Sequence, residues 1–600
     1  MKINLRPFLS APLLFFILSF SVLYTPQGAR TPPVNLNPID LSAEPDQPVL
    51  VRIYFKDVND LNLLAATLDI WEINHESDYL LALVRPEHFQ SISQSSFRVE
   101  IDDEKSTLLQ QQYQFLPNQN NGIPGFPCYR TVEETYTDLA QLSADNPSLA
   151  TWIDIGDSWE KDTPGGKSGY DLFTLVLTNS AIPGPKPKLY IISAMHGREL
   201  PTAELATRFA EYLVDNYSSD PDITWLLDYA EVHITPHANP DGRKIAENGD
   251  FWRKNTDNDD GCLDASWWGT DLNRNSSFKW GGVGASAFPC DDTYHGPAPS
   301  SEPETQSLQN YAASIFPDQR GPGDANPAQE NASGLFITLH SYGNLVLFPW
   351  GWTSDVPPND TSLETLGRKF GFFTNYQVCQ SGEIGCIYQT SGSTDDWTYG
   401  ELGVASYTFE LGSTFFESCE YFADSILPDN LEALIYAFKA ARHPYKDPAG
   451  PESIHLALTA DHIAPGAGLT LTATADDTRY NSNGKGEEAV QIIAAARYSI
   501  DSPSWVDGVT TYPLSAKDGN FNNYVESLTA SIDTTALAFG RHTIFVESQD
   551  SDSNWGVPTT IFLWITRETY LPGIVPDQQI QFADSLPEIN FTVQVTNLGT

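Results

Sequence analysis

Basic residues are scarce in this sequence, and their scarcity limits what the protein can bind. The chain holds 33 lysines and arginines against 78 aspartates and glutamates, a formal net charge of −45. So acidic a surface repels nucleic acid and anionic lipid, and we expect neither as a partner. It attracts cations, which include calcium and basic peptides. Acidity that serves only solubility is the simpler alternative.

Long apolar runs are missing after the first 30 residues, so no later segment is expected to span a membrane. At the start of the chain, Lys2 and Arg6 accompany an interrupted apolar stretch over residues 8–24. This pattern predicts a cleaved signal peptide over residues 1–29 and therefore a secreted protein. An uncleaved N-terminal anchor is the alternative.

Two signatures of well-known chemistry are also absent. The cysteines form no CxxC pair, which disfavours a zinc knuckle, and no GxSxG elbow marks a nucleophilic serine. An even number of cysteines in an exported chain predicts disulfides, for which fifteen pairings are possible. The cysteines are Cys128, Cys262, Cys290, Cys379, Cys386 and Cys419.

The texture of the sequence changes along the chain and predicts several domains, as its length requires. Residues 30–127 predict a small α+β unit whose last part, 105–127, is a linker. Apolar strands alternate with amphipathic helices over 128–446, which predicts an α/β layer fold around a largely buried sheet. Short alternating strands over 447–566 predict a β-sandwich of immunoglobulin or fibronectin III type, and 567–600 open a further β module that reads as incomplete.

Within the first unit, the pattern predicts three strands and two helices in alternation. The strands are "VLVRIYFKD", "YLLALVR" and "FRVEI", and the helices are "DLNLLAATL" and "EHFQSI".

Three residues suit a metal site. His196 and Glu199 lie in "SAMHGRE", directly after the apolar strand "KLYIISA", and His340 ends the strand "GLFITLH". Ligands of α/β sheets bind beyond the carboxyl ends of strands. Two histidines and one glutamate are a ligand set of catalytic zinc sites, which leave one position to water. Taken singly, His196 and Glu199 could simply belong to a surface loop. His340 could be a core histidine whose hydrogen bonds are satisfied within the protein.

Glu410 lies inside the apolar strand "ASYTFEL". Because a buried carboxylate without a partner is costly, it needs a charge, a metal or a catalytic role. A structural salt bridge is the alternative.

A series of motifs in one order makes the pattern specific. The series is "HGRE" (196–199), "NPDG" (239–242), "FWRK" (251–254), "DLNRN" (271–275), "TYHG" (293–296), "LHSYG" (339–343), "IYQTSGSTDDW" (387–397) and "YTFELG" (407–412). It closely resembles the metallocarboxypeptidase family of carboxypeptidases A, B and T over roughly residues 128–445. The resemblance implies a mixed sheet flanked by helices, with an active site at one edge. It also implies a secreted zinc enzyme that hydrolyses the C-terminal peptide bond of peptides and proteins.

The resemblance assigns catalytic roles to matching positions. The two histidines and Glu199 would bind one Zn²⁺ per chain, and Glu410 would be the general base. Arg253 would polarise the scissile carbonyl and stabilise its oxyanion, and Asp271 would orient the first zinc histidine. Cys262 and Cys290 bracket a segment that carries a disulfide in some relatives.

The resemblance also implies a substrate clamp and a specificity pocket. Asn273 and Arg274 would hold the terminal carboxylate, with Arg198 among the substrate-binding residues and Tyr388 closing over the peptide. Asp395 would lie at the base of the side-chain pocket, with Glu383 as a second lining acid. An acid there predicts a preference for C-terminal Lys or Arg, and a dual basic and apolar preference is the alternative.

Other functions remain open at this point. One is cleavage of cell-wall (peptidoglycan) peptides by the same zinc chemistry. Another is a non-catalytic secreted binding or adhesion protein whose β modules bind a surface or a partner. We expect residues 46–104 to form the pro-domain of a zymogen and to cover the active-site cleft, with a constitutive accessory domain as the alternative. We expect the β-sandwich to be dispensable for catalysis and its Asp- and Asn-rich turns to suit attachment or structural calcium.

Overall fold

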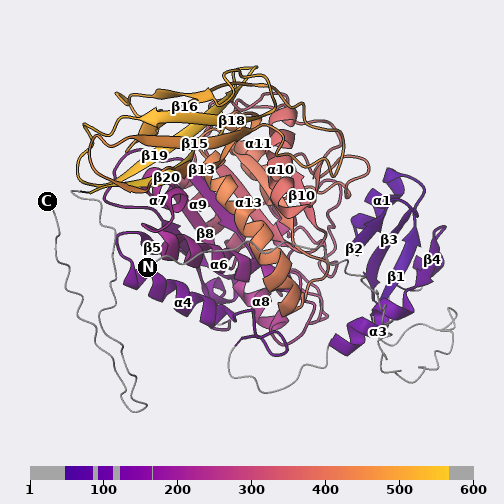
Figure 1. The fold of residues 1–600 in the computed structure, drawn as a ribbon. Helices are drawn as coiled ribbons and strands as arrows, with labels where there is room; N and C mark the ends of the chain where they lie inside the picture. Colours follow the sequence, from indigo (N-terminus) through magenta and orange to yellow (C-terminus); the bar gives the residue numbers. More distant parts are fainter. Residues whose placement is uncertain (1–47, 86–88, 90–91, 113–121, 165, 567–600) are drawn as a thin grey trace, which may run out of the picture.

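The computed structural model describes residues 48–566 except 86–88, 90–91, 113–121 and 165. It contains three bodies: an N-terminal unit (residues 48–112), an α/β domain (122–446) and a β-sandwich (447–566) (Figure 1). The predicted signal peptide and the predicted last module lie outside the described residues.

The N-terminal unit is a four-stranded antiparallel sheet in the order β2-β3-β1-β4. Helix α1 begins where the Asp57 side chain accepts hydrogen bonds from two backbone N–H groups, and it packs Leu61 and Leu64 against the sheet. The elements are β1 (Val49–Tyr54), α1 (Val58–Ala65), β2 (Asp69–Asn74), β3 (Tyr79–Val84), β4 (Arg98–Ile101) and α3 (Asp103–Gln112).

Two features of this unit were not predicted. Strand β2 was missed, because "DIWEIN" is short, carries acids at two positions and contains a register shift between Ile70 and Glu72. Helix α3 occupies the start of the predicted linker, whose residues 113–121 lie outside the described part. The predicted helix "EHFQSI" falls largely on residues that the structure does not describe.

The α/β domain is built on an eight-stranded mixed sheet in the order β11-β10-β12-β9-β7-β8-β6-β5. Strands β8, β7, β9 and β12 run parallel to one another, so their carboxyl ends meet at one edge. The strands are β5 (Ala150–Asp157), β6 (Asp171–Leu177), β7 (Lys188–Ile192), β8 (Glu231–Thr235), β9 (Leu335–His340), β10 (Leu345–Phe348), β11 (Gln377–Gln380) and β12 (Ala405–Glu410).

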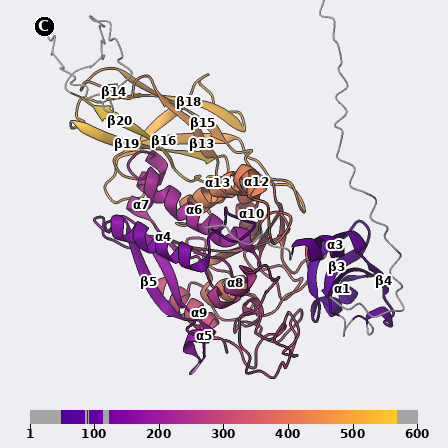
Figure 2. The same ribbon diagram turned by 90° about the horizontal axis from the view of Figure 1, so that it is seen from below.

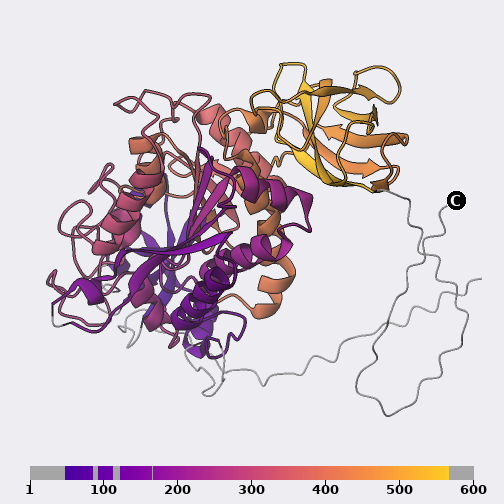
Figure 3. The ribbon, with the colours of Figure 1, turned by 90° about the vertical axis from the view of Figure 1, so that its left-hand side faces the viewer.

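Helices cover both faces of this sheet, as Figures 1 and 3 show. All six residues of β9 are buried, as expected of a central strand covered on both faces. The principal helices are α4 (Val132–Asp145), α6 (Leu200–Asn216), α7 (Pro221–Tyr229), α8 (Pro240–Ala246), α9 (Pro303–Ile315), α10 (Asp360–Thr374), α11 (Thr394–Leu402) and α13 (Leu427–Ala440). The predicted fold class is confirmed.

The β-sandwich encloses its own core, in which apolar residues of β15 and β18 meet those of β16, β19 and β20. Strand β17 pairs with both β18 and β16 and so joins the two sheets. The strands are β13 (Glu452–Leu458), β14 (His462–Ile463), β15 (Leu469–Asp476), β16 (Ile493–Ile500), β17 (Tyr512–Ala516), β18 (Val525–Ile532), β19 (Gly540–Asp550) and β20 (Thr559–Ile565).

All six cysteines form disulfides, and all three bonds lie within the α/β domain: Cys128–Cys419, Cys262–Cys290 and Cys379–Cys386. Across residues 48–566, leaving aside the gaps, no helix is both long enough and apolar enough to cross a membrane.

Candidate active site

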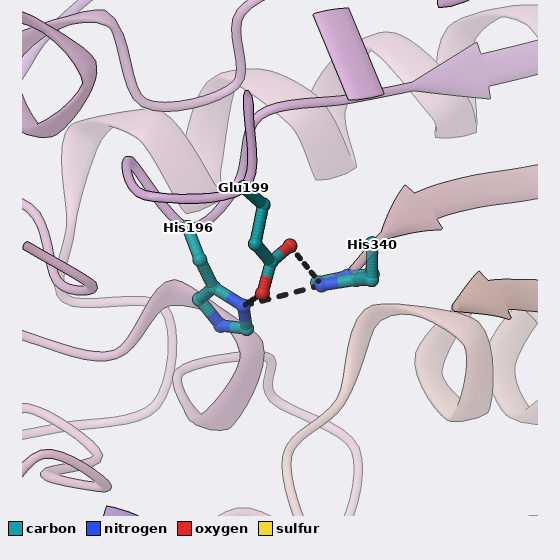
Figure 4. Close-up of side chains that lie close together, drawn as sticks. All are labelled: His196, Glu199 and His340. Atoms are coloured by element: carbon teal, nitrogen blue, oxygen red, sulfur yellow. Dashed lines mark hydrogen bonds and ion pairs between the residues drawn. The ribbon is translucent and has the colours of Figure 1, made fainter. Parts of the chain in front are cut away.

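Three side chains predicted to bind a metal meet at the carboxyl edge of the sheet. His196 and Glu199 lie in the loop between β7 and α6, and His340 is the last residue of β9. Because β7 and β9 are parallel neighbours, the loop and the strand end converge. His196 Nδ1 lies 2.7 Å from Glu199 Oε1, and His340 Nδ1 lies 3.0 Å from Glu199 Oε2 and 3.2 Å from His196 Nδ1 (Figure 4).

The chemistry of this group fits a divalent cation. All three side chains are at least 97 % buried, and two imidazole nitrogens face the same carboxylate. Burial, reinforced by the neighbouring Arg253, lowers the pKa of His196 and so favours the neutral, ligating form. Burial alone would raise the pKa of Glu199, but the two imidazoles hold it well below its usual value. Two nitrogen ligands and one carboxylate suit zinc.

Asp271 fixes the orientation of His196. Its Oδ1 accepts the Nε2–H of His196 at 3.1 Å, which leaves Nδ1 to face the metal group. Its Oδ2 accepts two hydrogen bonds from Arg253, at 2.8 and 3.0 Å. Asp271 is fully buried, yet these cationic neighbours hold its pKa well below the usual value against the effect of burial. One carboxylate therefore positions both a predicted metal ligand and the predicted oxyanion group.

A cavity of about 440 Å³ opens over the metal group. Arg253 Nη1 lies 3.4 Å from His196 Nδ1, and Asn273 and Arg274 line the same cavity. Arg274 donates to its neighbours' carbonyls: its Nε to Gly284 O and its Nη1 to Asn273 O, both at 2.8 Å. The cavity is thus lined by three guanidinium groups, those of Arg198, Arg253 and Arg274, and by the amide of Asn273.

Glu410 ends β12 opposite His340 in the parallel register and lines the cavity. Burial raises the pKa of its carboxyl to about 7, with a smaller contribution from Glu199 that the nearby His340 opposes. Among the described residues it has no ion pair. A carboxylate poised near neutral pH beside a metal group can exchange protons with a water molecule.

The predicted specificity residues separate in space. Asp395 lines the cavity and is 4 % exposed, its Oδ2 accepting from Thr408 at 3.2 Å and its Oδ1 from the Asp396 backbone N–H at 2.9 Å. Asp396 is structural, because its carboxylate accepts the backbone N–H groups of residues 351 and 352. Glu383 is not among the lining residues and pairs instead with Lys485 of the β-sandwich, at 3.3 Å.

Strand β2 of the N-terminal unit closes one side of the same cavity. This unit was expected to cover the active-site cleft, but the strand that does so was not identified from the sequence. Asp69 accepts two hydrogen bonds from Arg198, at 2.5 and 2.6 Å, and both side chains are at least 97 % buried. Trp71 stacks on Phe251 and meets Phe415 edge to face. Residues 70–73 line the cavity beside the metal group.

Further polar contacts join the N-terminal unit to the α/β domain around strand β2. Glu72 accepts from the Tyr342 hydroxyl at 3.2 Å, and the Asn62 side chain exchanges two hydrogen bonds with Gln389, at 2.9 and 3.0 Å. Tyr388, the predicted mobile phenol, packs against the apolar core of the N-terminal unit.

Comparison with known proteins gives one family. A family model described as zinc carboxypeptidase matches residues 135–432. Carboxypeptidase A2 of Rattus norvegicus is 32 % identical over 345 residues, which are 55 % of this chain and 75 % of the relative. Carboxypeptidase B of Astacus astacus is 32 % identical over 302 residues, 48 % of this chain and 87 % of the relative. Among solved structures, carboxypeptidase A from Helicoverpa armigera has a TM-score of 0.53 at 22 % identity and covers 67 % of this chain and 98 % of its own, a likeness of fold.

Proposed function

Because this chain belongs to the zinc carboxypeptidase family and is thus a metallocarboxypeptidase, we propose that its 440 Å³ cavity binds the C-terminal residue of a peptide. The observation that carries this proposal is that side chains distant in sequence converge on one cavity. A metal group, a carboxylate with a raised pKa and the guanidinium groups of Arg253 and Arg274 come from five separate chain segments and line one cavity.

We propose His196, Glu199 and His340 as the ligands of one zinc ion per chain, with Asp271 as the group that orients His196. When bound, the ion would polarise the scissile carbonyl and lower the pKa of a water molecule toward about 7. The ligand types, their burial and the convergence of their donor atoms support this assignment.

Glu410 is the proposed general base, which accepts a proton from the attacking water and delivers it to the leaving amine. Arg253 stabilises the negative charge that develops on the carbonyl oxygen. Its guanidinium suits this task, because two hydrogen bonds to Asp271 fix its plane and its pKa is held far above neutrality.

Asn273 and Arg274 are the proposed clamp for the terminal carboxylate, the group that distinguishes a chain end from mid-chain. A guanidinium grips a carboxylate through charge-assisted hydrogen bonds, and the amide adds donors without charge. Tyr388 is the proposed lid, and Arg198 binds the substrate farther from its end.

Asp395 is the proposed specificity residue, which favours C-terminal Lys or Arg. A buried carboxylate is costly unless a cation meets it, and a basic substrate supplies that cation. Its two protein donors, Thr408 and the Asp396 N–H, satisfy part of this need and support the dual preference, in which apolar residues are also accepted. The ion pair of Glu383 with Lys485 favours Asp395 over Glu383 as the discriminating acid.

The N-terminal unit is the proposed pro-domain of a secreted zymogen. In support, β2 covers the cavity and Asp69 neutralises Arg198, so a long peptide and β2 compete for one space. Three disulfides are consistent with an oxidising compartment outside the cell. Calcium was expected in turns of the β-sandwich, but the described part of the sandwich holds no cluster of three His, Cys, Asp or Glu ligands.

The first test is Glu410→Gln, with Glu401→Gln on exposed surface as the matched control. The amide cannot take a proton, so kcat should fall roughly 100-fold or more while zinc content stays at one per chain. Turnover within about tenfold of wild type would contradict the base role. Loss of zinc would show that Glu410 is structural.

The second test concerns the substrate. Digestion of a peptide library, with peptidoglycan stem peptides in parallel and a chelator as control, separates a protein carboxypeptidase from a cell-wall enzyme. Asp395→Ala should lower kcat/KM for peptides that end in Arg, which corresponds to a loss of about 2–5 kcal/mol of transition-state stabilisation. The same substitution should change kcat/KM little for matched peptides that end in Phe. An unchanged Arg-to-Phe ratio would exclude Asp395 as the specificity residue.

A further inference from the structure

A second group of carboxylates lies near the chain segment that follows Arg253, the proposed oxyanion-stabilising residue. Asp257, Asp260 and Glu302 each bring a carboxylate oxygen to within 4.8 Å of the others. Asp257 and Glu302 are 7 % and 1 % exposed. Glu304, which is fully buried, lies beside them and shares the Asn255 side chain with Glu302.

Within the described residues, these carboxylates have no basic partner within ion-pair distance. Lys254, which acts on Asp260 only through its long-range field, donates to three backbone carbonyls at 2.6 to 2.9 Å. The N-terminus of α9 adds about half a positive charge beside Glu302. That partial charge falls well short of balancing three anions, and buried carboxylates without compensation are unfavourable.

An unpartnered hydroxyl points into the same group. Thr270 is fully buried, its Oγ1 makes no hydrogen bond of regular geometry, and it faces the Glu302 carboxylate. Asp260 Oδ2 is likewise shielded from solvent and accepts no hydrogen bond of regular geometry, although the Tyr294 hydroxyl lies beside the Asp260 carboxyl. The nearby Thr270 hydroxyl lowers the pKa of Glu302, against the effect of burial. A threonine hydroxyl can also serve a hard cation as a neutral oxygen ligand.

We propose that Asp257, Asp260 and Glu302, with the hydroxyl of Thr270, form a calcium site. The donors are all oxygens, and Ca²⁺ accepts six to eight of them in a flexible arrangement, including bidentate carboxylates. Asn258 and Asp259 are exposed at the surface of the same loop, which gives the ion a path in and gives water access to its remaining positions.

The site would tie together two segments on which the active site depends. Asn255 accepts the Thr270 N–H at 2.7 Å and donates to Glu302 at 2.7 Å, so the cluster joins the chain just after Arg253 to the chain just before Asp271. A cation there would hold these two segments in register. Asp257, Asp260 and Glu302 are therefore positioning residues, which act through the Arg253–Asp271 pair and not through the zinc ligands.

The test uses the full-length, zinc-loaded protein and a readout that is independent of activity. Calcium titrated into wild type should bind with one equivalent and a Kd on the order of 10⁻⁴ M or tighter, and should raise Tm by roughly 5 °C at a hundredfold excess over Kd. Terbium should bind in place of calcium and emit by energy transfer from Tyr294, whose hydroxyl contacts Asp260.

Variants locate the site. Glu302→Gln and Asp260→Asn should each lose the calcium-dependent rise in Tm and the terbium emission while keeping one zinc per chain. Asp264→Asn removes the same charge from an exposed position in the same loop and should behave as wild type. If Glu302→Gln fails to fold, the half-buried Asp260→Asn and the wild-type titration carry the test.

Two results would overturn the proposal. Absence of binding heat and of a Tm change in wild type would mean that the carboxylates are held protonated. Equal losses in Asp264→Asn and Glu302→Gln would place the ion elsewhere. Neither result bears on the zinc chemistry, because zinc content and terbium emission are measured separately.

Discussion

The N-terminal unit and the β-sandwich contact different parts of the α/β domain, the first at the cavity and the second mainly away from it. In Figures 1 and 2 the N-terminal unit lies at the right of the domain and the body of the β-sandwich at its upper left. The N-terminal unit contacts residues that line the cavity, among them Arg198, Tyr342 and Phe415. Under the proposed function a substrate would need the same surface, so this contact would persist only while the enzyme is idle.

The β-sandwich attaches mainly where no cavity residue lies. Val378 of the edge strand β11 donates its N–H to Asn483 O at 2.9 Å, and Asn481 donates to the Gly371 carbonyl at 2.5 Å. Lys369 of α10 is fully buried and pairs with Glu452 at 3.2 Å. These contacts cap a sheet edge and neutralise a buried lysine, needs that exist in every state of the enzyme.

The difference between these two sets of contacts indicates that the N-terminal unit is the reversible attachment. A region that competes with substrate can serve as a switch, whereas a region that completes the fold cannot be removed without loss of stability. We therefore expect the N-terminal unit to govern activity and the β-sandwich to govern stability.

The largest expected effect is on stability. A chain that ends after Lys446 exposes the β11 edge and removes both Glu452, which pairs with Lys369, and the Tyr480 ring, whose centroid lies 3.8 Å from the Lys369 ammonium. We therefore expect a fall in unfolding free energy of about 5 kcal/mol or more. Calorimetry and the soluble yield measure this. Any folded fraction should still hydrolyse small peptides, since no proposed catalytic residue lies in the sandwich. Unchanged Tm would refute the stabilising role.

The second-largest expected effect is that of Asp69→Asn on the activity of the uncleaved chain. The substitution leaves Arg198 buried without an anion, so docking of the N-terminal unit should weaken by about 3–5 kcal/mol. Activity of the uncleaved chain toward long peptides should rise accordingly, measured as kcat/KM before and after limited proteolysis. Asp78→Asn, in an exposed turn of the same unit, is the control. If both variants stay equally latent, the ion pair does not hold the unit.

Lys369→Met probes the sandwich interface with a single side chain. Glu452 keeps Arg479 at 3.1 Å, so the expected loss is smaller, about 2–3 kcal/mol of unfolding free energy. Denaturant unfolding of the full chain provides the measurement. Lys188→Met, which breaks a partly exposed pair with Glu231 at 3.5 Å, should cost less than about 1 kcal/mol.

Acid should have the smallest effect. Burial would raise the pKa of Asp69, but Arg198 holds it below its usual 3.8. A depressed pKa means that the docking contribution is complete above about pH 4 and is lost only as the pH falls through the lower, docked value. Trp71 fluorescence should therefore stay constant from pH 7 to 5. A transition within that range would point to a different group.

Much of this could be predicted from the sequence. His196, Glu199 and His340 could be found because motifs at strand ends report where a parallel sheet collects its ligands, and the structure brings the three together. The fold class followed from strands that alternate with helices, and the family from motifs in one order.

The rest depends on partners that are distant in sequence. Asp69 is 129 residues from Arg198, and strand β2 carries no strong periodicity, so neither its existence nor its role had a local signal. Lys485 reaches Glu383 from another domain, which a motif-based assignment of the pocket could not include. The cluster of Asp257, Asp260 and Glu302 forms only when α9 packs beneath the loop.

The placement of the disulfides decides what happens after a cut between the N-terminal unit and the α/β domain. All six cysteines lie at or beyond position 128, so no covalent bond other than the main chain joins the two regions. While the chain is intact, tethering keeps the unit at an effective concentration on the order of millimolar. Under the proposed zymogen role, a single cut would replace that value with the far lower concentration of free fragments. A unit that dissociated would then be diluted and would rarely rebind, which would make activation a one-way step.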